Sequence, residues 1–129
     1  MKEIALNNYT IFNGELETVI PSNGKTVINT INAHSYIVAK KDLDFKNALE
    51  ESDVLIPDGE GIVLMVKNLT GKKIKKIAGA DIHLKLLEIA EQQGLKCFYL
   101  GSSEETLNLI NSKISKRYPN IKFGFFSPP

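Results

Sequence analysis

The segment from Ile56 to Gly61, with the sequence IPDGEG, constrains the fold of this chain more than any other. A short apolar run at residues 54–56 leads into it, and a denser one at residues 62–66 follows. This order predicts a strand, a tight turn and a buried helix. Pro57 stiffens the exit from the strand, and the two glycines let backbone N–H groups come close to a ligand. In open α/β sheets, ligands bind at such strand-to-helix turns.

The segment has two carboxylates, Asp58 and Glu60, and Asp58 is the one at the turn. The start of the following helix favours an anionic group such as a diphosphate, because a helix N-terminus carries a partial positive charge. A carboxylate beside that anion needs a reason. Two interpretations of Asp58 are open at this point: it caps the helix, or it performs a chemical task in a site.

The rest of the chain alternates between segments typical of strands and segments typical of helices. Strands are expected at residues 9–12, 26–31, 54–56, 96–100 and 121–126, with a turn at 13–14. In the first half of the chain, helices are expected at 15–20 (stopped by 21–24), after Asn32, after Asp42, and at 61–68, where Gly71 closes the helix. In the second half, they are expected from Asp81 to Gly94 and from the capping pair Ser102 and Glu105 to Tyr118. The pattern predicts a single α/β domain over residues 1–129, with a parallel sheet covered by helices on both faces.

Composition and charge narrow the setting. Hydrophobic residues make up 43% and charged residues 24%, and the net charge is +1, so we expect no general attraction to nucleic acid. The single cysteine, Cys97, lies in an apolar run and indicates a buried thiol in a reducing compartment. Residues after Met1 form no apolar signal core, and no run approaches the roughly 18 apolar residues that span a bilayer. A cytoplasmic protein with at most peripheral membrane contact is expected.

Several small or polar residues fall at the predicted strand-to-helix turns and helix starts. These residues are Thr30, Asn32, Asp58, Gly79 and Gly101. Because the carboxyl ends of parallel strands share one edge of a sheet, we expect these residues to line one pocket.

Two other patterns have competing explanations. Asp42 and Asp44 match the D-x-D spacing by which many sugar-nucleotide transferases hold a divalent metal, but helix capping already explains them, so no metal is expected here. The basic run at residues 72–76 suits phosphates or an anionic lipid headgroup, and it equally suits a solvated loop.

Five motifs occur in the order seen in one enzyme family, the WecG/TagA/CpsF glycosyltransferases, and the resemblance covers most of the chain. The motifs are T-x-N-A at residues 30–33, P-D-G-x-G at 57–61, G-A-D at 79–81, the strand end at 98–101 and G-F-F-S-P-P at 124–129. The resemblance implies a Rossmann-like sheet and an inverting transfer without a bound metal or other cofactor.

The resemblance also implies the substrates. Family members transfer an N-acetylmannosamine-type sugar from a UDP-sugar donor to a polyprenyl-diphosphate-linked sugar acceptor, for teichoic acid, common-antigen or capsule assembly. It implies work in the cytoplasm, at the inner face of the cell membrane, through peripheral contact. A homo-oligomer is compatible with it.

The family's motifs assign roles to individual residues. The proposed base falls on Asp58, where it would deprotonate the acceptor hydroxyl. A family arginine that assists the leaving diphosphate falls on Lys76, which keeps the charge and loses the bidentate fork. The expected substrate-binding residues are Thr30, Asn32, Gly59, Gly61, Gly79, Asp81, Gly101 and Ser102.

The main departure from the family is length, because the chain resembles only its N-terminal half. Two alternatives to an active transferase therefore stay open: a catalytically silent module that binds a sugar nucleotide or a partner, and an unrelated α/β domain whose glycines only form turns. UDP binding without transfer would favour the silent module, and no nucleotide binding would favour the unrelated domain.

Overall fold

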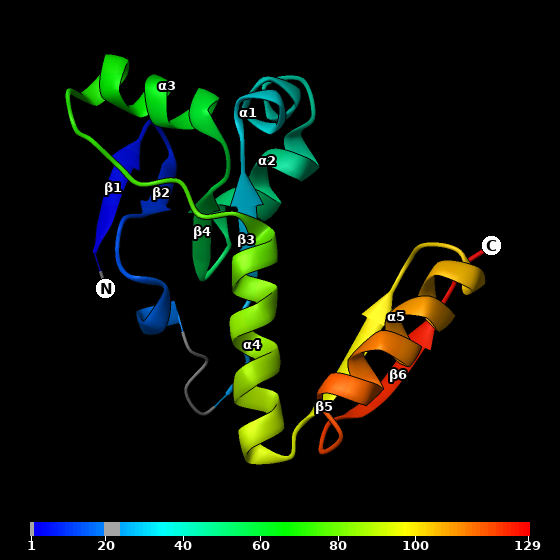
Figure 1. The fold of residues 1–129 in the computed structure, drawn as a ribbon. Coiled ribbons are helices and arrows are strands. Elements are labelled where there is room, and N and C mark those ends of the chain that lie inside the picture. The colour runs from blue at the N-terminus through cyan, green and yellow to red at the C-terminus, as the bar shows by residue number, and fades with distance from the viewer. Residues whose placement is uncertain (1, 20–23) are drawn as a thin grey trace. The chain divides into compact units, whose positions relative to one another are not determined.

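The computed structural model describes residues 2–19 and 24–129. The chain forms two compact units, Met1–Ile82 and His83–Pro129, and each combines strands with helices (Figure 1). The first unit contains β1 (Glu3–Leu6), β2 (Tyr9–Phe12), the 3-10 helix η1 (Leu16–Val19), β3 (Ile28–Ile31), α1 (Ala33–Ala39), α2 (Leu43–Glu50), β4 (Val54–Pro57) and α3 (Glu60–Thr70). Helix α4 (Gly79–Gln93) begins in the first unit and continues into the second, which adds β5 (Lys96–Leu100), α5 (Glu104–Arg117) and β6 (Lys122–Phe126). The predicted α/β class is confirmed.

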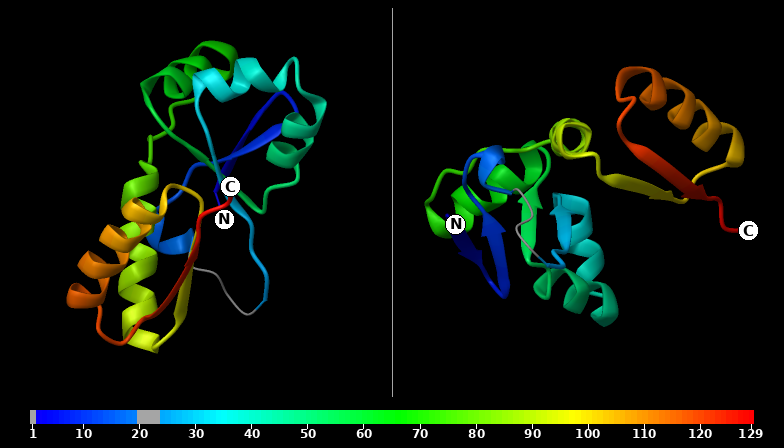
Figure 2. Two further views of the ribbon diagram at one scale, coloured as in Figure 1. Left: turned by 90° about the vertical axis from the view of Figure 1, so that its right-hand side faces the viewer. Right: turned by 90° about the horizontal axis from the view of Figure 1, so that it is seen from below.

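The strands pair in three two-stranded ladders among the described residues. Strands β3 and β4 are parallel, with Ile28 opposite Val54, and β5 and β6 are parallel, with Lys96 opposite Lys122. Parallel strands need a crossover connection, which α1 and α2 supply in the first unit and α5 in the second. Both views of Figure 2 show α5 alongside its strand pair. The predicted parallel pairing is confirmed for these strands.

The core of the first unit lies between its strands and helices. Strand β4 is buried over its whole length, as expected for an apolar strand of a parallel sheet. It lies alongside β2, while α2 contacts β2 and α3 contacts β1. The side chains at the centre of this core are fully buried: Ile11, Ile31, Ile62 and Val66.

Strand β1 was missed by the sequence analysis. It pairs antiparallel with β2, and its side chains alternate between exposed and buried. The hairpin turn lies at Asn7 and Asn8, so the turn predicted at residues 13–14 is not the one that joins the strands. Asn7 has a φ of 52°, a conformation that asparagine tolerates better than most residues.

Helix α3 is less buried than its composition suggests. Only Ile62 and Val66 are buried, four residues apart on one face, while Leu64 and Leu69 are 57% and 61% exposed. The prediction of a buried helix is wrong, because α3 covers the core with a single face.

Helix ends follow the predicted chemistry with one exception. Asp42 caps α2 by accepting a hydrogen bond from the Phe45 N–H at 3.0 Å, and Gly71 ends α3 in the left-handed conformation at φ 74°. In α5 the cap is Ser103, whose hydroxyl accepts from the Thr106 N–H at 3.2 Å, and not Ser102 as predicted. The predicted stop of the short helix before β3 lies largely outside the described residues, at 20–23.

The second unit has its own small core. Leu87 and Ala90 of α4 pack there with Tyr118 and Ile121. The Tyr99 ring stacks on Phe123 at a centroid distance of 6.0 Å. This core fixes α5 against the β5–β6 pair.

Candidate functional site

The carboxyl ends of β3 and β4 bring two of the predicted motifs together. Thr30 lies opposite Ile56 in the parallel register, and the Asp58 N–H donates to the Ile31 carbonyl at 2.9 Å. The turn that follows β4 is therefore tied to the end of β3. Thr30 is exposed and Asp58 half-buried, so both side chains lie at the surface of this shared edge.

Asn32 sits between β3 and α1 and caps the helix. Its side-chain oxygen accepts from the Ser35 N–H at 2.8 Å, and the Ser35 hydroxyl accepts from the Asn32 N–H at 2.8 Å. This reciprocal pair is a capping box. Within the described residues, the side-chain amide nitrogen of Asn32 donates no hydrogen bond, so it remains available to a ligand at the same edge.

Gly61 allows α1 and α3 to approach each other closely at their starts. A Cβ atom at Gly61 would lie 2.9 Å from the Cβ of Ala33, closer than two such atoms can pack. Ala33 is the first residue of α1, and Gly61 is the second of α3. The T-x-N and P-D-G-x-G motifs are thus held side by side by a contact that requires glycine.

The start of α3 leaves the Asp58 carboxylate free of a capping role. The cap position is Gly59, with φ 93°, and no side chain of the residues that the structure describes caps this helix. A glycine accepts that φ at no steric cost. Capping therefore does not explain Asp58, which removes one of the two interpretations open from the sequence.

Lys76 lies beside the start of α3, where it forms an ion pair that the sequence did not predict. Its Nζ is 2.7 Å from the Glu60 Oε1, in the first turn of α3. The hydrogen bond and the negative charge of Glu60 raise the pKa of Lys76, which therefore stays protonated at neutral pH. Residues 16 positions apart show no local pattern, so only the fold reveals this pair.

The basic run that contains Lys76 is held in place by apolar residues. Ile74 and Ile77 are buried, and the Ile77 N–H donates to the Pro57 carbonyl at 2.8 Å. The run is therefore an irregular segment fixed beside the end of β4, with its lysines exposed. That placement keeps open both interpretations from the sequence, a phosphate-facing segment and a solvated loop.

Gly79 and Asp81 open helix α4 next to this segment. Asp81 lies in the first turn and helps to line a shallow hollow of about 190 Å³ together with Lys75, Lys76 and Ile77. A Cβ at Gly79 would meet no atom within 4 Å, so packing does not require glycine there.

Gly101 and Ser102 belong to the second unit. Both have positive φ, 116° and 68°, at the end of β5. The Gly101 N–H donates to the Phe126 carbonyl at 3.0 Å, and the Ser102 carbonyl accepts from the Ser127 hydroxyl at 2.6 Å. These contacts explain the local turn. Of the predicted site residues in the first unit, Thr30, Asn32, Asp58, Gly59 and Gly61 lie at the joined ends of β3 and β4. Lys76 contacts this edge through Glu60, and Gly79 and Asp81 follow at the start of α4.

In the part of the chain that the structure describes, no group of three or more His, Cys, Asp or Glu side chains is placed so that it could hold a metal ion. The oxygen of Asp42 is engaged in its helix cap, as expected. Transfer without a metal stays a prediction. Across residues 2–19 and 24–129, no helix is both long and apolar enough to cross a membrane.

Cys97 is half-buried on β5 rather than fully buried as the sequence suggested. Burial raises the pKa of its thiol, so the thiolate fraction at pH 7 is lower than that of a free cysteine. We predict that Cys97 reacts with iodoacetamide more slowly than glutathione at pH 7, and that the rate rises as the pH increases toward 9. Timed mass spectrometry of the alkylated protein measures both, and a rate above that of glutathione would contradict this.

Comparison with known proteins adds a family and named relatives. The model of the glycosyl transferase WecG/TagA/CpsF family matches residues 4–129. A relative from Bacillus subtilis is 35% identical over 101 residues, 78% of this chain and 40% of the relative. One from Bacillus spizizenii is 29% identical over 120 residues, 92% of this chain and 46% of the relative. Both are named N-acetylglucosaminyldiphosphoundecaprenol N-acetyl-beta-D-mannosaminyltransferase. The chain spans less than half the length of these relatives.

Proposed function

Because the chain belongs to the glycosyl transferase WecG/TagA/CpsF family, we propose that it carries the catalytic base of an inverting glycosyl transfer. The donor is a UDP-sugar of the N-acetylmannosamine type, and the acceptor is a sugar on a polyprenyl diphosphate. The names of the relatives support this choice of sugar and acceptor. The product would enter the synthesis of a cell-surface polymer such as teichoic acid.

The observation that carries the proposal is the uncapped start of α3. Asp58 is half-buried at the shared edge of β3 and β4, and its carboxylate is not used to cap the helix that follows. A carboxylate in that position is suited to accept a proton from an acceptor hydroxyl.

In the proposed step, the acceptor oxygen attacks the anomeric carbon of the donor while its proton passes to Asp58. The new C–O bond forms as the bond to the diphosphate breaks, and UDP leaves with the electron pair. Attack from the face opposite the leaving group inverts the anomeric centre. Thr30 and the side-chain amide nitrogen of Asn32 would contact the substrates at the same edge.

Lys76 is the proposed partner of the leaving diphosphate. Its ammonium lies beside the start of α3, where backbone N–H groups and the helix dipole also favour an anion. Glu60 holds Lys76 in the absence of substrate, and a diphosphate would compete with Glu60 for it. We propose that these groups neutralise the leaving group without a metal ion or another cofactor.

Substitution of Lys76 separates its charge from its geometry. Lys76→Met is expected to lower the transfer rate about ten- to hundred-fold, the range for losing one hydrogen bond to a charged group. Lys76→Arg should retain the rate or increase it, because a guanidinium can bind a diphosphate through two donors. Steady-state transfer assays measure this.

Lys73→Met is the matched control, since Lys73 is an exposed lysine of the same run with no ion pair among the described residues. Equal losses from Lys73→Met and Lys76→Met would indicate a general charge effect and contradict a specific role for Lys76.

A second candidate is a binding fragment without activity of its own, which the coverage of less than half of the relatives favours. Calorimetric titration with UDP and a transfer assay with a polyprenyl-diphosphate sugar analogue distinguish the two. Binding with transfer supports the transferase, binding alone supports the fragment, and the absence of both contradicts each.

We place the protein in the cytoplasm, at the inner membrane face, because its proposed acceptor is a lipid.

A further inference from the structure

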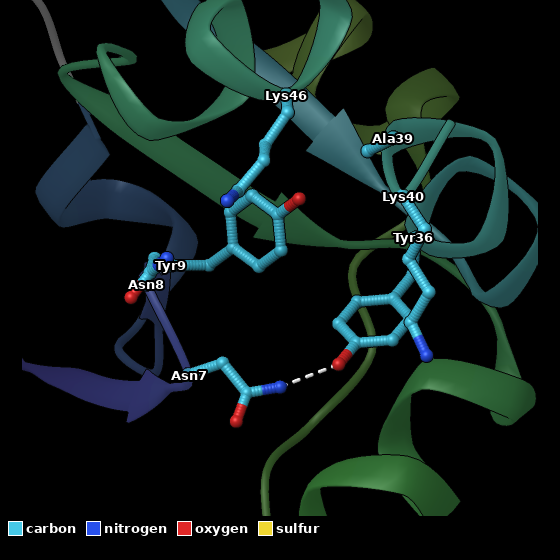
Figure 3. Close-up of a pocket in the computed structure, with 7 residues that line it drawn as sticks. All are labelled: Asn7, Asn8, Tyr9, Tyr36, Ala39, Lys40 and Lys46. Atoms are coloured by element: carbon cyan, nitrogen blue, oxygen red, sulfur yellow. Dashed lines mark hydrogen bonds between the residues drawn. The ribbon is translucent and has the colours of Figure 1, made fainter. Parts of the chain in front are cut away.

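The first unit contains a cavity that none of the residues assigned to transfer lines. The hairpin turn between β1 and β2, helix α1 and helix α2 border a half-open cavity of about 290 Å³ (Figure 3). Tyr9 and Tyr36 contribute rings, Asn7 an amide, and Lys40 and Lys46 ammonium groups. Its lining therefore combines a small area of aromatic side chain with positive charge.

The tyrosine walls are held in place by contacts on several sides. Tyr9 and Tyr36 are only 5% and 7% exposed, and their rings meet edge to face with centroids 5.9 Å apart. The Tyr36 hydroxyl accepts a hydrogen bond from the Asn7 side-chain amide. Figure 3 shows both rings directed toward the space between the hairpin and α1. The small part of each ring that stays exposed lines the cavity and suits apolar contact with the C–H groups of a small ring.

The two lysines give the cavity an excess of positive charge. Lys40 Nζ lies 5.2 Å from the centroid of the Tyr36 ring, and Lys46 Nζ lies 3.6 Å from the Glu50 carboxylate. This one carboxylate offsets one of the two ammonium groups. Each ammonium has three donors, so Lys46 can bind an anion while it stays near Glu50.

Tyr9 remains a neutral donor in this setting. Its burial, with a further effect from the charge of Glu50, raises the pKa of the Tyr9 hydroxyl above its ordinary value of 10.0. The cavity therefore offers the Tyr9 hydroxyl as a donor beside the side chains of Lys40 and Lys46, a set suited to phosphate oxygens.

We propose that this cavity binds a phosphate ester of a single-ring molecule, such as a monosaccharide phosphate. The lysines would hold the phosphate and the tyrosines the ring. The volume is at the lower end of the range for small-molecule sites, about 300–1,000 Å³, which favours one ring over a whole nucleotide sugar. The site is additional to the proposed transfer at Asp58 and does not depend on it.

Calorimetric titration of the whole chain with glucose 1-phosphate, inorganic phosphate and glucose tests the proposal. Glucose 1-phosphate is expected to bind with a Kd of about 1 mM or tighter, and each of the other two at least about ten-fold more weakly. Lys40→Met should weaken the binding about ten-fold or more, through loss of one charged hydrogen bond. Lys41→Met is the matched control, because Lys41 is exposed and does not line the cavity. It should leave the affinity unchanged.

NMR titration of the wild-type chain keeps the test independent of any variant's folding. Addition of glucose 1-phosphate should shift the amide signals of Asn7, Tyr36 and Lys46. The absence of binding up to about 10 mM, equal affinity for inorganic phosphate, or shifts confined to other residues would overturn the proposal. An equal loss from Lys40→Met and Lys41→Met would overturn it as well.

Discussion

Asp58→Asn is expected to reduce the rate of sugar transfer by at least about a hundred-fold while the UDP-sugar still binds, because general-base assistance is typically worth a hundred- to ten-thousand-fold. Asparagine keeps the shape of the side chain and still accepts a hydrogen bond, but it is not an effective proton acceptor. Stability should change little, since no side chain caps α3 in the structure. Donor affinity is expected to hold or to improve, because the variant removes a negative charge near the diphosphate.

Asp44→Asn is the matched control for this variant. Asp44 is exposed in the first turn of α2 and has no proposed role in transfer. Its substitution removes the same charge and should leave the transfer rate within about two-fold, since surface changes of this kind have small effects. A large loss in both variants would indicate that net charge, and not Asp58, controls the rate.

Gly61→Val is expected to lower the free energy of unfolding by about 1–3 kcal/mol, the usual effect of excess volume in a packed contact. The first added carbon would already lie 2.9 Å from the Cβ of Ala33, so α1 and α3 must move apart. Because these helices carry the T-x-N and P-D-G-x-G motifs, UDP binding should weaken at the same time. Urea unfolding and calorimetric titration measure the two effects.

Gly79→Val provides the comparison for Gly61→Val, since a Cβ at Gly79 meets no atom within 4 Å. It should change the stability by less than about 0.5 kcal/mol. If the two variants were equally stable, the close approach of α1 and α3 would not exist in solution.

The parts of the fold that depend on local chemistry could be predicted from the sequence. Asp42 at the start of α2 and Gly71 at the end of α3 were assigned from residue type and spacing alone. The parallel pairing followed from the alternation of strands and helices. These features are set by backbone conformation and short-range hydrogen bonds, which a linear pattern records.

The features that depend on tertiary contacts could not be predicted in the same way. The Glu60–Lys76 ion pair joins two segments whose proximity is set by the hydrogen bond from Ile77 to Pro57. The exposed leucines of α3 reflect which face the core covers, and composition does not contain that information. The cap of α5 shifted from Ser102 to Ser103 because the backbone of Ser102 adopts φ 68°, which is unsuited to a cap.

The sequence predicted which strand ends form the site, but it did not predict the contacts that the site residues make. Thr30 and Asp58 share an edge because parallel strands end together, which the pattern already implies. That Asp58 is not the helix cap became clear only from the backbone of Gly59. The distinction between a structural and a chemical role for Asp58 thus rests on the geometry of one residue.

The most direct test of the proposed catalytic base is a single-turnover measurement with limiting donor and with enzyme and acceptor at saturating concentrations, which isolates the chemical step from binding. Wild type and Asp58→Asn are compared in parallel, with donor affinity measured on the same samples. If the chain alone does not transfer the sugar, the comparison uses a protein of the family's full length that contains this sequence. We predict a single-turnover rate lower by at least about a hundred-fold for Asp58→Asn, with donor affinity retained. Equal rates for the two proteins would contradict the assignment of Asp58 as the base.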